Sequence, residues 1–559
     1  MEKYVKSDNN FYQKDNEKKV IVLEAGETWL ISETTKMDVL VIAKNATITV
    51  PDGYSLTMTV NNVGTVIKQG TYEGNIVLSV TENITENSVT FRTGIYIEDG
   101  AYVAEKSVAA IVASGTVTDT SANDVHITSN EGKFDGIIVN GDSKYTIINP
   151  VIDLSGNGGD DWTGYGTAIM STGNSDVTVY NAKISGTGYN RCAFFAGGNS
   201  TLHVNNSEIE VYNGILNSNP TFLDKKVKSM LIGPWLFGVV GRVRATNVVE
   251  NATVYYNNTH IKAQQWGALS TDNPTKLRLY ATNCLIETVE SGYGAYAIGD
   301  CLDYFSGCTF NVVDYGLILC DYASGTFTDG CVVNSKKIGV MMHDGSGGSI
   351  LTIDKGSVLN TKSTVIQIKG RRGANIIADN AELNSESGII LQTMPNDDPN
   401  MSSWDYSGGD QSYSRDVTAT FSNMELNGDF INGFTASGAV SVTLKNATLT
   451  GAITTATTEH PLFNNEEITS DTPEFYYLLG EINNTYCATD GPYGISASLD
   501  ANSKWVVETT SYLTALSIEE GAIITAPKGY TVTMTIDDIA TEIKSGTYEG
   551  KIVLTVTKS

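Results

Sequence analysis

Three short stretches decide the fold of this chain: Asn283-Cys284-Leu285-Ile286, Gly307-Cys308-Thr309-Phe310 and Gly330-Cys331-Val332-Val333. Each is one copy of a motif that consists of Asn or Gly, a small residue, any residue, and an aliphatic residue or Phe. The motif occurs ten times, beginning at Asn181, Asn206, Asn258, Asn283, Gly307, Gly330, Gly356, Asn380, Asn423 and Asn446. Most copies are 23–26 residues apart. Such a period is typical of a solenoid, in which each coil buries its apolar face by stacking on the next.

The residues between copies of the motif are short runs rich in Val, Ile, Thr and Tyr, interrupted by Gly, Asn and Asp. This composition is typical of strands and turns and not of helices. The sequence therefore predicts an all-β chain folded as a parallel β-helix of about ten or more coils, right-handed because parallel crossover connections prefer that hand. In such a fold, residues one period apart become neighbours about 4.8 Å apart and form straight columns.

Length and composition bound the class of protein. A chain of 559 residues, of which 41% are hydrophobic and 18% charged, can bury a large core. The length alone suggests about three or four domains, but a solenoid grows in one dimension and needs no such division. A formal net charge of -27 argues against nucleic acid or an anionic membrane as a partner, because its field repels phosphate groups.

No targeting signal is visible in the sequence. No apolar run is long enough to span a bilayer, so we expect no membrane insertion. The first residues, MEKYVKSDNNFYQKDNEKK, are polar and lack the hydrophobic core and small-residue cleavage site of a signal peptide. We therefore expect a cytoplasmic protein; a secreted or cell-surface location would require a leader ahead of this sequence.

Three of the seven cysteines, Cys284, Cys308 and Cys331, occupy the small-residue position of the motif. We expect them to stack inside the coil, where thiols behave as small hydrophobic groups. Disulfides or a metal site are the alternative, but the count is odd and no CxxC pair occurs. We expect no metal and no other cofactor.

The two ends of the chain carry copies of one sequence. Residues 51–81, PDGYSLTMTVNNVGTVIKQGTYEGNIVLSVT, return as residues 527–557, PKGYTVTMTIDDIATEIKSGTYEGKIVLTVT, with 19 of 31 positions identical. Alternating strand residues and turn glycines indicate a small β module at each end. We expect these modules to cap the β-helix, whose open strand edges would otherwise pair with other chains. A dimerisation surface or a lid over the substrate is the alternative.

These features divide the chain into segments. In chain order we expect a polar N-terminal segment (1–20), the N-terminal β module (21–106), the parallel β-helix (107–452), a connecting segment (453–503) and the C-terminal β module (504–559). Loops inserted near residues 220–247 and 394–416 break the period, and such insertions often lie on the binding face of a solenoid. The first is unusually apolar and includes Trp235, which would form either a wall over a groove or a structural buttress.

One predicted turn position carries charged side chains on five consecutive coils. Aligning WGALSTD, AYAIGD, YGLILCD, IGVMMHD and STVIQIK puts Asp272, Asp300, Asp321, Asp344 and Lys369 in one column, with His343 before Asp344 and with Arg371 and Arg372 after Lys369. Stacked acids cannot all be ionised without a basic neighbour, so the pKa of one rises, which yields the acid and base that hydrolases and lyases need. The alternative is ordinary turn chemistry, in which Asp caps backbone N–H groups.

Aromatic residues accompany this column. Tyr293, Tyr296, Tyr315, Tyr322 and Trp266 are expected near the same face. Their rings would suit stacking on a sugar or a flat apolar ligand. Aromatic side chains are also ordinary filler in β solenoids, so this pattern indicates a binding face without requiring one.

The motif and period resemble the right-handed parallel β-helix, or pectin-lyase-like, superfamily over roughly residues 108–449. Within it, the order Asp300, Asp321, His343 and Lys369, each one coil beyond the last, is similar to the active-site order of the polygalacturonase-type glycoside hydrolases. That family carries Asn-Thr-Asp, Asp-Asp, Gly-His-Gly and Arg-Ile-Lys motifs on successive coils. The resemblance implies a glycoside hydrolase, and an inverting hydrolase needs an acid and a base with room for a water molecule.

The chain departs from each of these family motifs. The departures are Ile298-Gly299 for Asn-Thr before Asp300, Cys320 and Tyr322 around a single Asp321, Met342 and Asp344 around His343, and Gln367-Ile368-Lys369 for Arg-Ile-Lys. The second acid of the Asp-Asp motif is therefore missing, which removes a group that the inverting mechanism uses.

Three functions are compatible with these observations. The first is a carbohydrate-active enzyme (glycoside hydrolase, lyase or epimerase), in which Asp300 or Asp321 is the general acid, His343 relays a proton and Lys369 holds a substrate oxygen. Asp344 belongs to the same catalytic column, and the substrate-binding residues would be Arg371, Arg372, Tyr293, Tyr296, Tyr322, Trp266, Asp272 and Trp235.

The second function is a cytoplasmic lyase or isomerase that acts on a smaller apolar or aromatic molecule, indicated by the absent leader and the apolar loop. The third is a non-enzymatic adhesin or scaffold, indicated by regularity alone. The expected partners are a small molecule or an oligosaccharide, not nucleic acid, and a homo-oligomer through the terminal modules is possible.

Overall fold

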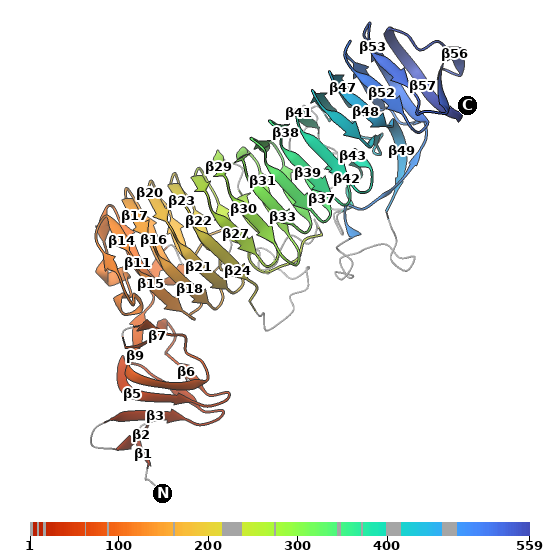
Figure 1. The fold of residues 1–559 in the computed structure, drawn as a ribbon. Helices are drawn as coiled ribbons and strands as arrows, with labels where there is room; N and C mark the ends of the chain where they lie inside the picture. The colour runs from red at the N-terminus through yellow and green to blue at the C-terminus, as the bar shows by residue number, and fades with distance from the viewer. Residues whose placement is uncertain are drawn as a thin grey trace. The chain divides into compact units, whose positions relative to one another are not determined.

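The computed structural model shows an all-β protein (Figure 1). It describes residues 4–7, 10–14, 18–61, 63–86, 89–159, 162–214, 238–272, 276–343, 348–370, 373–397, 415–460 and 478–559. In these ranges no α-helix occurs; η1 (Ala104–Lys106) and η2 (Ala109–Ile111) are short 3₁₀ helices. No helix in the described part of the chain is long and apolar enough to cross a membrane. The predicted fold class, a parallel β-helix with a small β module at each end, is confirmed.

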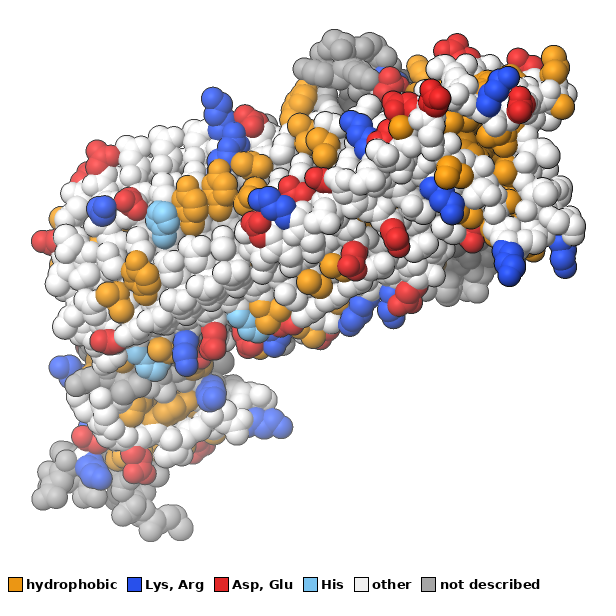
Figure 2. All heavy atoms as spheres, turned by 45° about the horizontal axis from the view of Figure 1, so that its top comes forward, with side chains coloured by type: hydrophobic (Ala, Val, Ile, Leu, Met, Phe, Trp, Pro, Cys, Tyr) orange, Lys and Arg blue, Asp and Glu red, His pale blue; other side chains and the backbone are white. Residues whose placement is uncertain are grey.

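The described residues form two compact units. The first unit holds the described residues up to 214 together with 242–263, and the second holds 238–241 together with the described residues from 264 onward. On the face drawn in Figure 2, acidic and basic side chains are scattered among uncharged ones. The net charge is therefore not gathered into one patch on that face.

In the first unit, each coil contributes strands to three parallel sheets. The first sheet contains β11 (Val89–Glu98), β16 (Phe134–Asn140), β19 (Ile169–Ser171), β22 (Phe194–Ala196) and β25 (Thr246–Val248). The second contains β14 (Ser121–Asn123), β17 (Lys144–Ile148), β20 (Asp176–Tyr180), β23 (Thr201–Asn205) and β26 (Thr253–Asn257). The third contains β15 (His126–Ser129), β18 (Val151–Ser155), β21 (Lys183–Thr187), β24 (Glu208–Tyr212) and β27 (His260–Ala263).

The second unit repeats this arrangement. Its first sheet contains β28 (Gly267–Asp272), β31 (Tyr293–Ile298), β34 (Tyr315–Cys320), β37 (Ile338–His343), β40 (Ile366–Lys369), β43 (Ile389–Met394), β46 (Asp429–Asn432) and β49 (Ile453–Glu459). The second contains β29 (Leu277–Thr282), β32 (Cys301–Ser306), β35 (Ser324–Thr328), β38 (Ser349–Asp354), β41 (Ala374–Asp379), β44 (Val417–Ser422) and β47 (Val440–Lys445). The third position is taken by β30 (Leu285–Thr288), β33 (Thr309–Val312), β36 (Val332–Ser335), β39 (Val358–Thr361), β42 (Glu382–Ser385), β45 (Glu425–Asn427) and β48 (Thr448–Gly451).

The sequence motif marks the turn between the second and third strands of a coil. Its first residue has a positive φ in all ten copies, between 48° and 78°. Glycine adopts this left-handed conformation freely and asparagine tolerates it, which explains why only these two residue types occur there. Asparagine also bonds along the column: Asn181 Nδ2 donates to Asn149 Oδ1 at 2.9 Å, and Asn446 Nδ2 donates to Asn423 Oδ1 at 2.8 Å.

The second residue of the motif points into the coil. Cys284, Cys308 and Cys331 are each at most 2% exposed, and none of the three forms a disulfide. The Cys284 amide donates to Cys308 Sγ at 3.4 Å, and the Cys308 amide donates to Cys331 Sγ at 3.3 Å. The predicted interior cysteine column is confirmed.

The two terminal modules contain equivalent strands in the same order. Equivalent residues are 476 positions apart throughout, beginning with Lys19 and Ile495. In the N-terminal module the strands are β3 (Lys19–Leu23), β4 (Thr28–Leu30), β5 (Thr35–Ile42), β6 (Thr47–Thr49), β7 (Tyr54–Val60), β8 (Val63–Gly64) and β9 (Gly70–Glu82). In the C-terminal module they are β51 (Ile495–Leu499), β52 (Lys504–Val507), β53 (Ser511–Ile518), β54 (Ile523–Thr525), β55 (Tyr530–Ile536), β56 (Ile539–Thr541) and β57 (Gly546–Lys558). The repeat of structure therefore extends beyond the 31 residues that match best in sequence.

Two further strands lie ahead of β3. The strands β1 (Tyr4–Ser7) and β2 (Asn10–Lys14) pair antiparallel, and β2 pairs with β3. The described parts of the segment 1–20, which was predicted only to be polar, thus contribute strands to the sheet of the module.

Candidate functional site

The outer face of the first sheet in the first unit carries an apolar column. Tyr96, Ile138, Met170 and Phe195 follow one another in register on β11, β16, β19 and β22. They belong to one hydrophobic cluster whose members are each at most 5% exposed. This column is the floor of a pocket.

The loop between β18 and β19 forms a wall of this pocket. Tyr165 stacks on Phe91 with ring centroids 4.5 Å apart and an interplanar angle of 12°. Gly164 has a φ of +74°, and a Cβ there would lie 2.3 Å from Cγ of Phe195. Only glycine lets the loop backbone lie this close to the ring. Trp162, on the same loop, remains 41% exposed.

A buried acid and a buried guanidinium anchor the loop. Asp135 Oδ1 accepts hydrogen bonds from the amides of Gly166 and Thr167, both at 2.9 Å. Arg191 Nη1 donates to the Gly166 carbonyl at 2.9 Å and also to the Phe134 carbonyl. Burial raises the pKa of Asp135 well above its usual value, against the opposing effect of the two amides and Arg191. Because removing one partner of such a network leaves the other unsatisfied in the interior, these bonds hold the wall in place.

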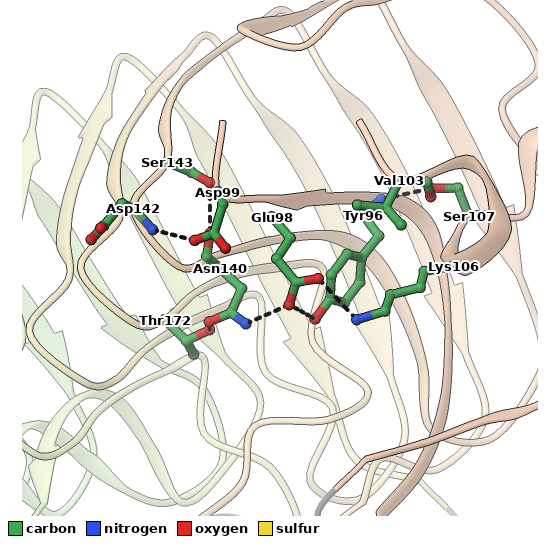
Figure 3. Close-up of polar contacts among 10 residues, drawn as sticks. All are labelled: Tyr96, Glu98, Asp99, Val103, Lys106, Ser107, Asn140, Asp142, Ser143 and Thr172. Atoms are coloured by element: carbon green, nitrogen blue, oxygen red, sulfur yellow. Dashed lines mark hydrogen bonds and ion pairs between the residues drawn. The ribbon is translucent and has the colours of Figure 1, made fainter. Parts of the chain in front are cut away.

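Three lining residues of the pocket, Tyr96, Asn140 and Thr172, belong to a row of hydrogen-bonded polar side chains (Figure 3). Glu98 Oε1 accepts hydrogen bonds from Asn140 Nδ2 at 3.3 Å and from the Tyr96 hydroxyl at 3.4 Å. Thr172 Oγ1 donates to Asn140 Oδ1 at 3.0 Å. Lys106 Nζ lies 3.0 Å from Glu98 Oε2 and 4.6 Å from the ring centroid of Tyr96. The row therefore joins the amide and hydroxyl groups that line the pocket to the carboxylate of Glu98.

Together these elements enclose a pocket of about 360 Å³. Its lining residues are Tyr96, Ile138, Trp162, Tyr165, Met170, Phe195 and Val249 on the apolar side and Asn140, Thr163, Thr172, Gly197 and Glu250 on the polar side. Glu250 accepts a hydrogen bond from the Gly198 amide through Oε2. The volume lies at the lower end of the range for small-molecule sites.

The charged column predicted from the sequence lies in the second unit, where the structure sets a different register. Asp272, Ile298, Cys320, His343 and Lys369 follow one another on β28, β31, β34, β37 and β40. Asp272, His343 and Lys369 thus share one row, with two apolar residues between the acid and the histidine. Each of the three is at most 8% exposed.

The two proposed acids lie beyond this row, in turns. Asp300 follows the end of β31 by two residues, its side chain is 53% exposed, and Arg278 lies 3.5 Å away. Asp321 follows β34 directly, has a φ of 56°, and its carbonyl accepts a hydrogen bond from Ser349 Oγ at 2.7 Å. Tyr322, the next residue, is 42% exposed. The structure therefore does not bring the two acids into one row with His343 and Lys369.

The remaining predicted site residues divide into two groups. Trp266 and Tyr293 are 1% exposed, and Tyr296 is half-buried. The Tyr293 and Tyr296 ring centroids are 5.6 Å apart, and the Tyr293 hydroxyl lies 3.0 Å from Ser270 Oγ. The predicted residues Asp344, Arg371, Arg372 and Trp235 lie outside the described residues.

Lys369 pairs with an acid that sequence reasoning did not single out. Its Nζ lies 2.5 Å from Asp397 Oδ1, and its side chain is fully buried. Asp397 Oδ2 lies 2.8 Å from His460 Nε2 and accepts a hydrogen bond from the Gly480 amide at 2.7 Å. Burial acts to raise the pKa of Asp397, but Lys369, His460 and the Gly480 amide outweigh it and hold that pKa below its usual range.

A segment around Gly480, which we call the strap (478–481), lies across the outer face of this sheet. Lys337 Nζ donates to the Leu479 carbonyl at 2.5 Å, and Gln367 Nε2 donates to the Gly480 carbonyl at 2.9 Å. A Cβ on Gly480 would lie 3.3 Å from Cδ1 of Ile338. The face that carries Gln367 and Lys369 is therefore occupied by the strap.

Sequence reasoning missed both the pocket and the strap. Asp397 and His460 are 63 residues apart and lie outside the motif, so no spacing linked them. The pocket had a weak signal: Ile138, Met170 and Phe195 occupy equivalent positions of consecutive coils, and Trp162 lies in the long connection between β18 and β19. Neither signal can be read before the coils are in register.

No model of a known protein family matches this chain, and no curated protein matches it in sequence.

Proposed function

We propose that this chain binds a neutral sugar unit of a glycan in the pocket over β11, β16, β19 and β22. The observation that supports this proposal is the juxtaposition of an exposed Trp162 and an aromatic floor with the polar row of Glu98, Asn140 and Thr172. A sugar ring needs both surfaces, because its C–H face stacks on aromatic rings while its hydroxyls need donors and acceptors.

Charge favours a neutral sugar over an acidic one. Glu250 lines the pocket, Glu98 is hydrogen-bonded to the lining residue Asn140, and the whole chain has a net charge of -27. A uronic acid would bring a carboxylate toward these groups, and like charges in a partly buried site repel. The proposal therefore excludes pectin-like polyanions as the preferred ligand.

The proposal is for recognition and not for bond cleavage. Glycoside hydrolysis usually requires one carboxylic acid and one carboxylate at a defined separation across the bond. Glu98 is already paired with Lys106, and Glu250 accepts the Gly198 amide. The acid–base column of the second unit remains a separate hypothesis, because Lys369 is paired with Asp397 beneath the strap.

Binding to an array of neutral and acidic oligosaccharides, followed by calorimetry on the hits, tests the proposal. We expect neutral glycans to bind and Trp162→Ala to weaken binding about tenfold or more, the scale of one lost stacking contact. Tyr180→Ala is the matched control, since Tyr180 is also exposed (40%) but lies on β20 of the second sheet.

Two outcomes would refute this proposal. One is the absence of any glycan ligand together with binding of flat apolar molecules, which would assign the pocket to the smaller apolar ligand class. The other is equal glycan binding by Trp162→Ala and Tyr180→Ala, which would move the site away from this pocket.

A further inference from the structure

We propose that the outer face of the C-terminal module is a docking surface for the first coil of the β-helix in another copy of this chain. The first coil is here the segment that contains η2 and β15. The inference rests on a comparison of the two terminal modules and does not depend on the saccharide proposal.

In the N-terminal module, the equivalent face of the sheet is covered. Its inner face is apolar, with Leu56 and Met58 in the module core. The opposite face carries Ser55, Thr57, Thr59 and Ser79, and these are buried as well, at most 8% exposed. A sheet face made of small hydroxyl residues is buried here because it lies against another element.

That element is the first coil. The strand β7 contacts η2, and β8 contacts both η2 and β15. Asn130 Nδ2 donates to the Ile67 carbonyl at 3.1 Å. Glu131, at the end of the same coil, accepts a hydrogen bond from the Leu56 amide on the free edge of β7. The module thus contacts the coil through both a face and an edge.

The C-terminal module presents the same face uncovered. The equivalents of Ser55, Thr57, Thr59 and Ser79 are four threonines, of which Thr531 and Thr533 are exposed and Thr535 and Thr555 half-exposed. Ile539 of β56, the counterpart of the coil-contacting strand β8, is 70% exposed. An apolar side chain on a strand edge beside a row of threonines resembles an unoccupied contact surface and not a solvated one.

The C-terminal module uses its other side within its own chain. The strand β51 pairs with β47, and β52 pairs with β48, so the module continues the coils of the second unit. Trp505, which is fully buried, donates from Nε1 to the Gly451 carbonyl at 2.9 Å. Each module can therefore contact a preceding coil on one side and a following first coil on the other.

A second copy supplies the missing coil. In the intact chain that coil is already covered by its own N-terminal module, and an intramolecular contact has the advantage of high effective concentration. When the C-terminal module of one copy replaces the N-terminal module on the first coil of another copy, the contact is head-to-tail. Such a contact can repeat from copy to copy without closing. We therefore expect association to appear when the N-terminal module releases its coil.

Sedimentation of matched variants tests the proposal. Thr57→Arg places a long charged side chain in the covered contact and should yield head-to-tail oligomers, because the freed coil accepts the C-terminal module of another copy. Thr533→Arg, the same change at the equivalent position, should remain monomeric. The double variant Thr57→Arg/Thr533→Arg should also be monomeric, although its coil is equally free.

Each other outcome decides the matter. Oligomers of the double variant would show unspecific association of the exposed coil and would overturn the proposal. A Thr57→Arg variant that is monomeric although its coil is free would also overturn it. Hydrogen–deuterium exchange across residues 104–131 reports whether the coil is free. A coil that stays protected in Thr57→Arg would show that this face does not make the contact, which also overturns the proposal. Wild-type oligomers that Thr533→Arg abolishes would support it.

Discussion

The outer faces of the first sheet differ between the two units, although both are bordered by a loop that buried charges hold in place. In the first unit, Asp135 and Arg191 anchor a loop at the side of the sheet, and a pocket stays open beside it. In the second unit, Asp397 binds Lys369 of the sheet and the Gly480 amide, and the strap crosses the face. The same kind of anchored loop therefore leaves a pocket open in the first unit and covers the face in the second, depending on where the loop runs.

The largest effect is expected for Lys369→Met. The change leaves the Asp397 carboxylate buried without its closest cation, and breaking a buried pair in this way costs about 3–5 kcal/mol. The free energy of unfolding from denaturant titration should fall accordingly, and the strap should lose protection in hydrogen exchange.

The double variant Lys369→Met/Asp397→Leu is the control for this experiment. Removing both charges should recover part of the lost stability, because no uncompensated ion remains. Equal stability of Lys369→Met and the wild type would show that the strap is not held by this pair, and the two faces would then differ for another reason.

Gly164→Ala should have the next largest effect, in the first unit only. The φ of +74° and the contact with the Phe195 ring leave no room for a methyl group, and overpacking of this kind costs about 1–3 kcal/mol. Glycan binding should weaken together with stability, because Trp162 moves with the loop. Gly26→Ala, with a similar φ of +78° and no atom within 4 Å of the added Cβ, separates the steric effect from the backbone strain. Unchanged binding in Gly164→Ala would show that the pocket wall is not preformed.

The two anchors should respond to pH in opposite directions. The folded-state pKa of Asp397 is lowered, so its contribution to stability is present above the unfolded pKa of about 3.9 and is lost as the pH falls below it. The folded-state pKa of Asp135 is raised. Its contribution to stability is therefore complete below the unfolded pKa and is lost as the pH rises through the folded-state pKa.

Local hydrogen exchange, corrected for its intrinsic pH dependence, measures both responses. Acid should expose residues 478–481 while residues 162–168 stay protected. Asp397→Asn should remove the acid response of the strap, and Asp135→Asn should flatten the alkaline response of the loop. A strap that keeps full protection at low pH in the wild type would contradict the assignment of Asp397 as its anchor.

The smallest response is expected from the interior cysteines. The hydrogen bond with Cys284 and burial raise the pKa of Cys308 to about 12, and a protonated buried thiol reacts poorly. Cys284, Cys308 and Cys331 should therefore resist thiol reagents in the native protein and also in Lys369→Met. Fast labelling in that variant alone would show that the strap stabilises the coils beneath it and does not merely cover them.

The sequence was sufficient for the fold because the fold depends on local, repeated requirements. A left-handed turn at each motif needs Asn or Gly, and a narrow interior next to it needs a small side chain such as Cys308. Both requirements recur at a fixed spacing and can be read without knowing which residues meet in space.

The candidate sites depend on register, which the sequence determines less well. The predicted column treated Asp300 and Asp321 as equivalents of Asp272, but the strands align Ile298 and Cys320 with it. Asp300 lies two residues beyond Ile298, in the turn after β31 that includes Gly299 with a φ of 84°. Lys369 pairs with Asp397, and Asp397 pairs with His460, which lies 63 residues further along the chain, so only the folded chain brings the three together.

The amide ladder of the motif has a mechanical consequence. Hydrogen bonds between coils run along the solenoid, so a pulling force along it loads successive junctions in series and the weakest junction yields first. In both units the ladder adds side-chain bonds outside the sheets, such as those from Asn181 and Asn446 to the preceding coil. These bonds reinforce each junction at its turn, where strand pairing has ended. Stretching should therefore release whole coils one at a time, as steps of about one repeat length each.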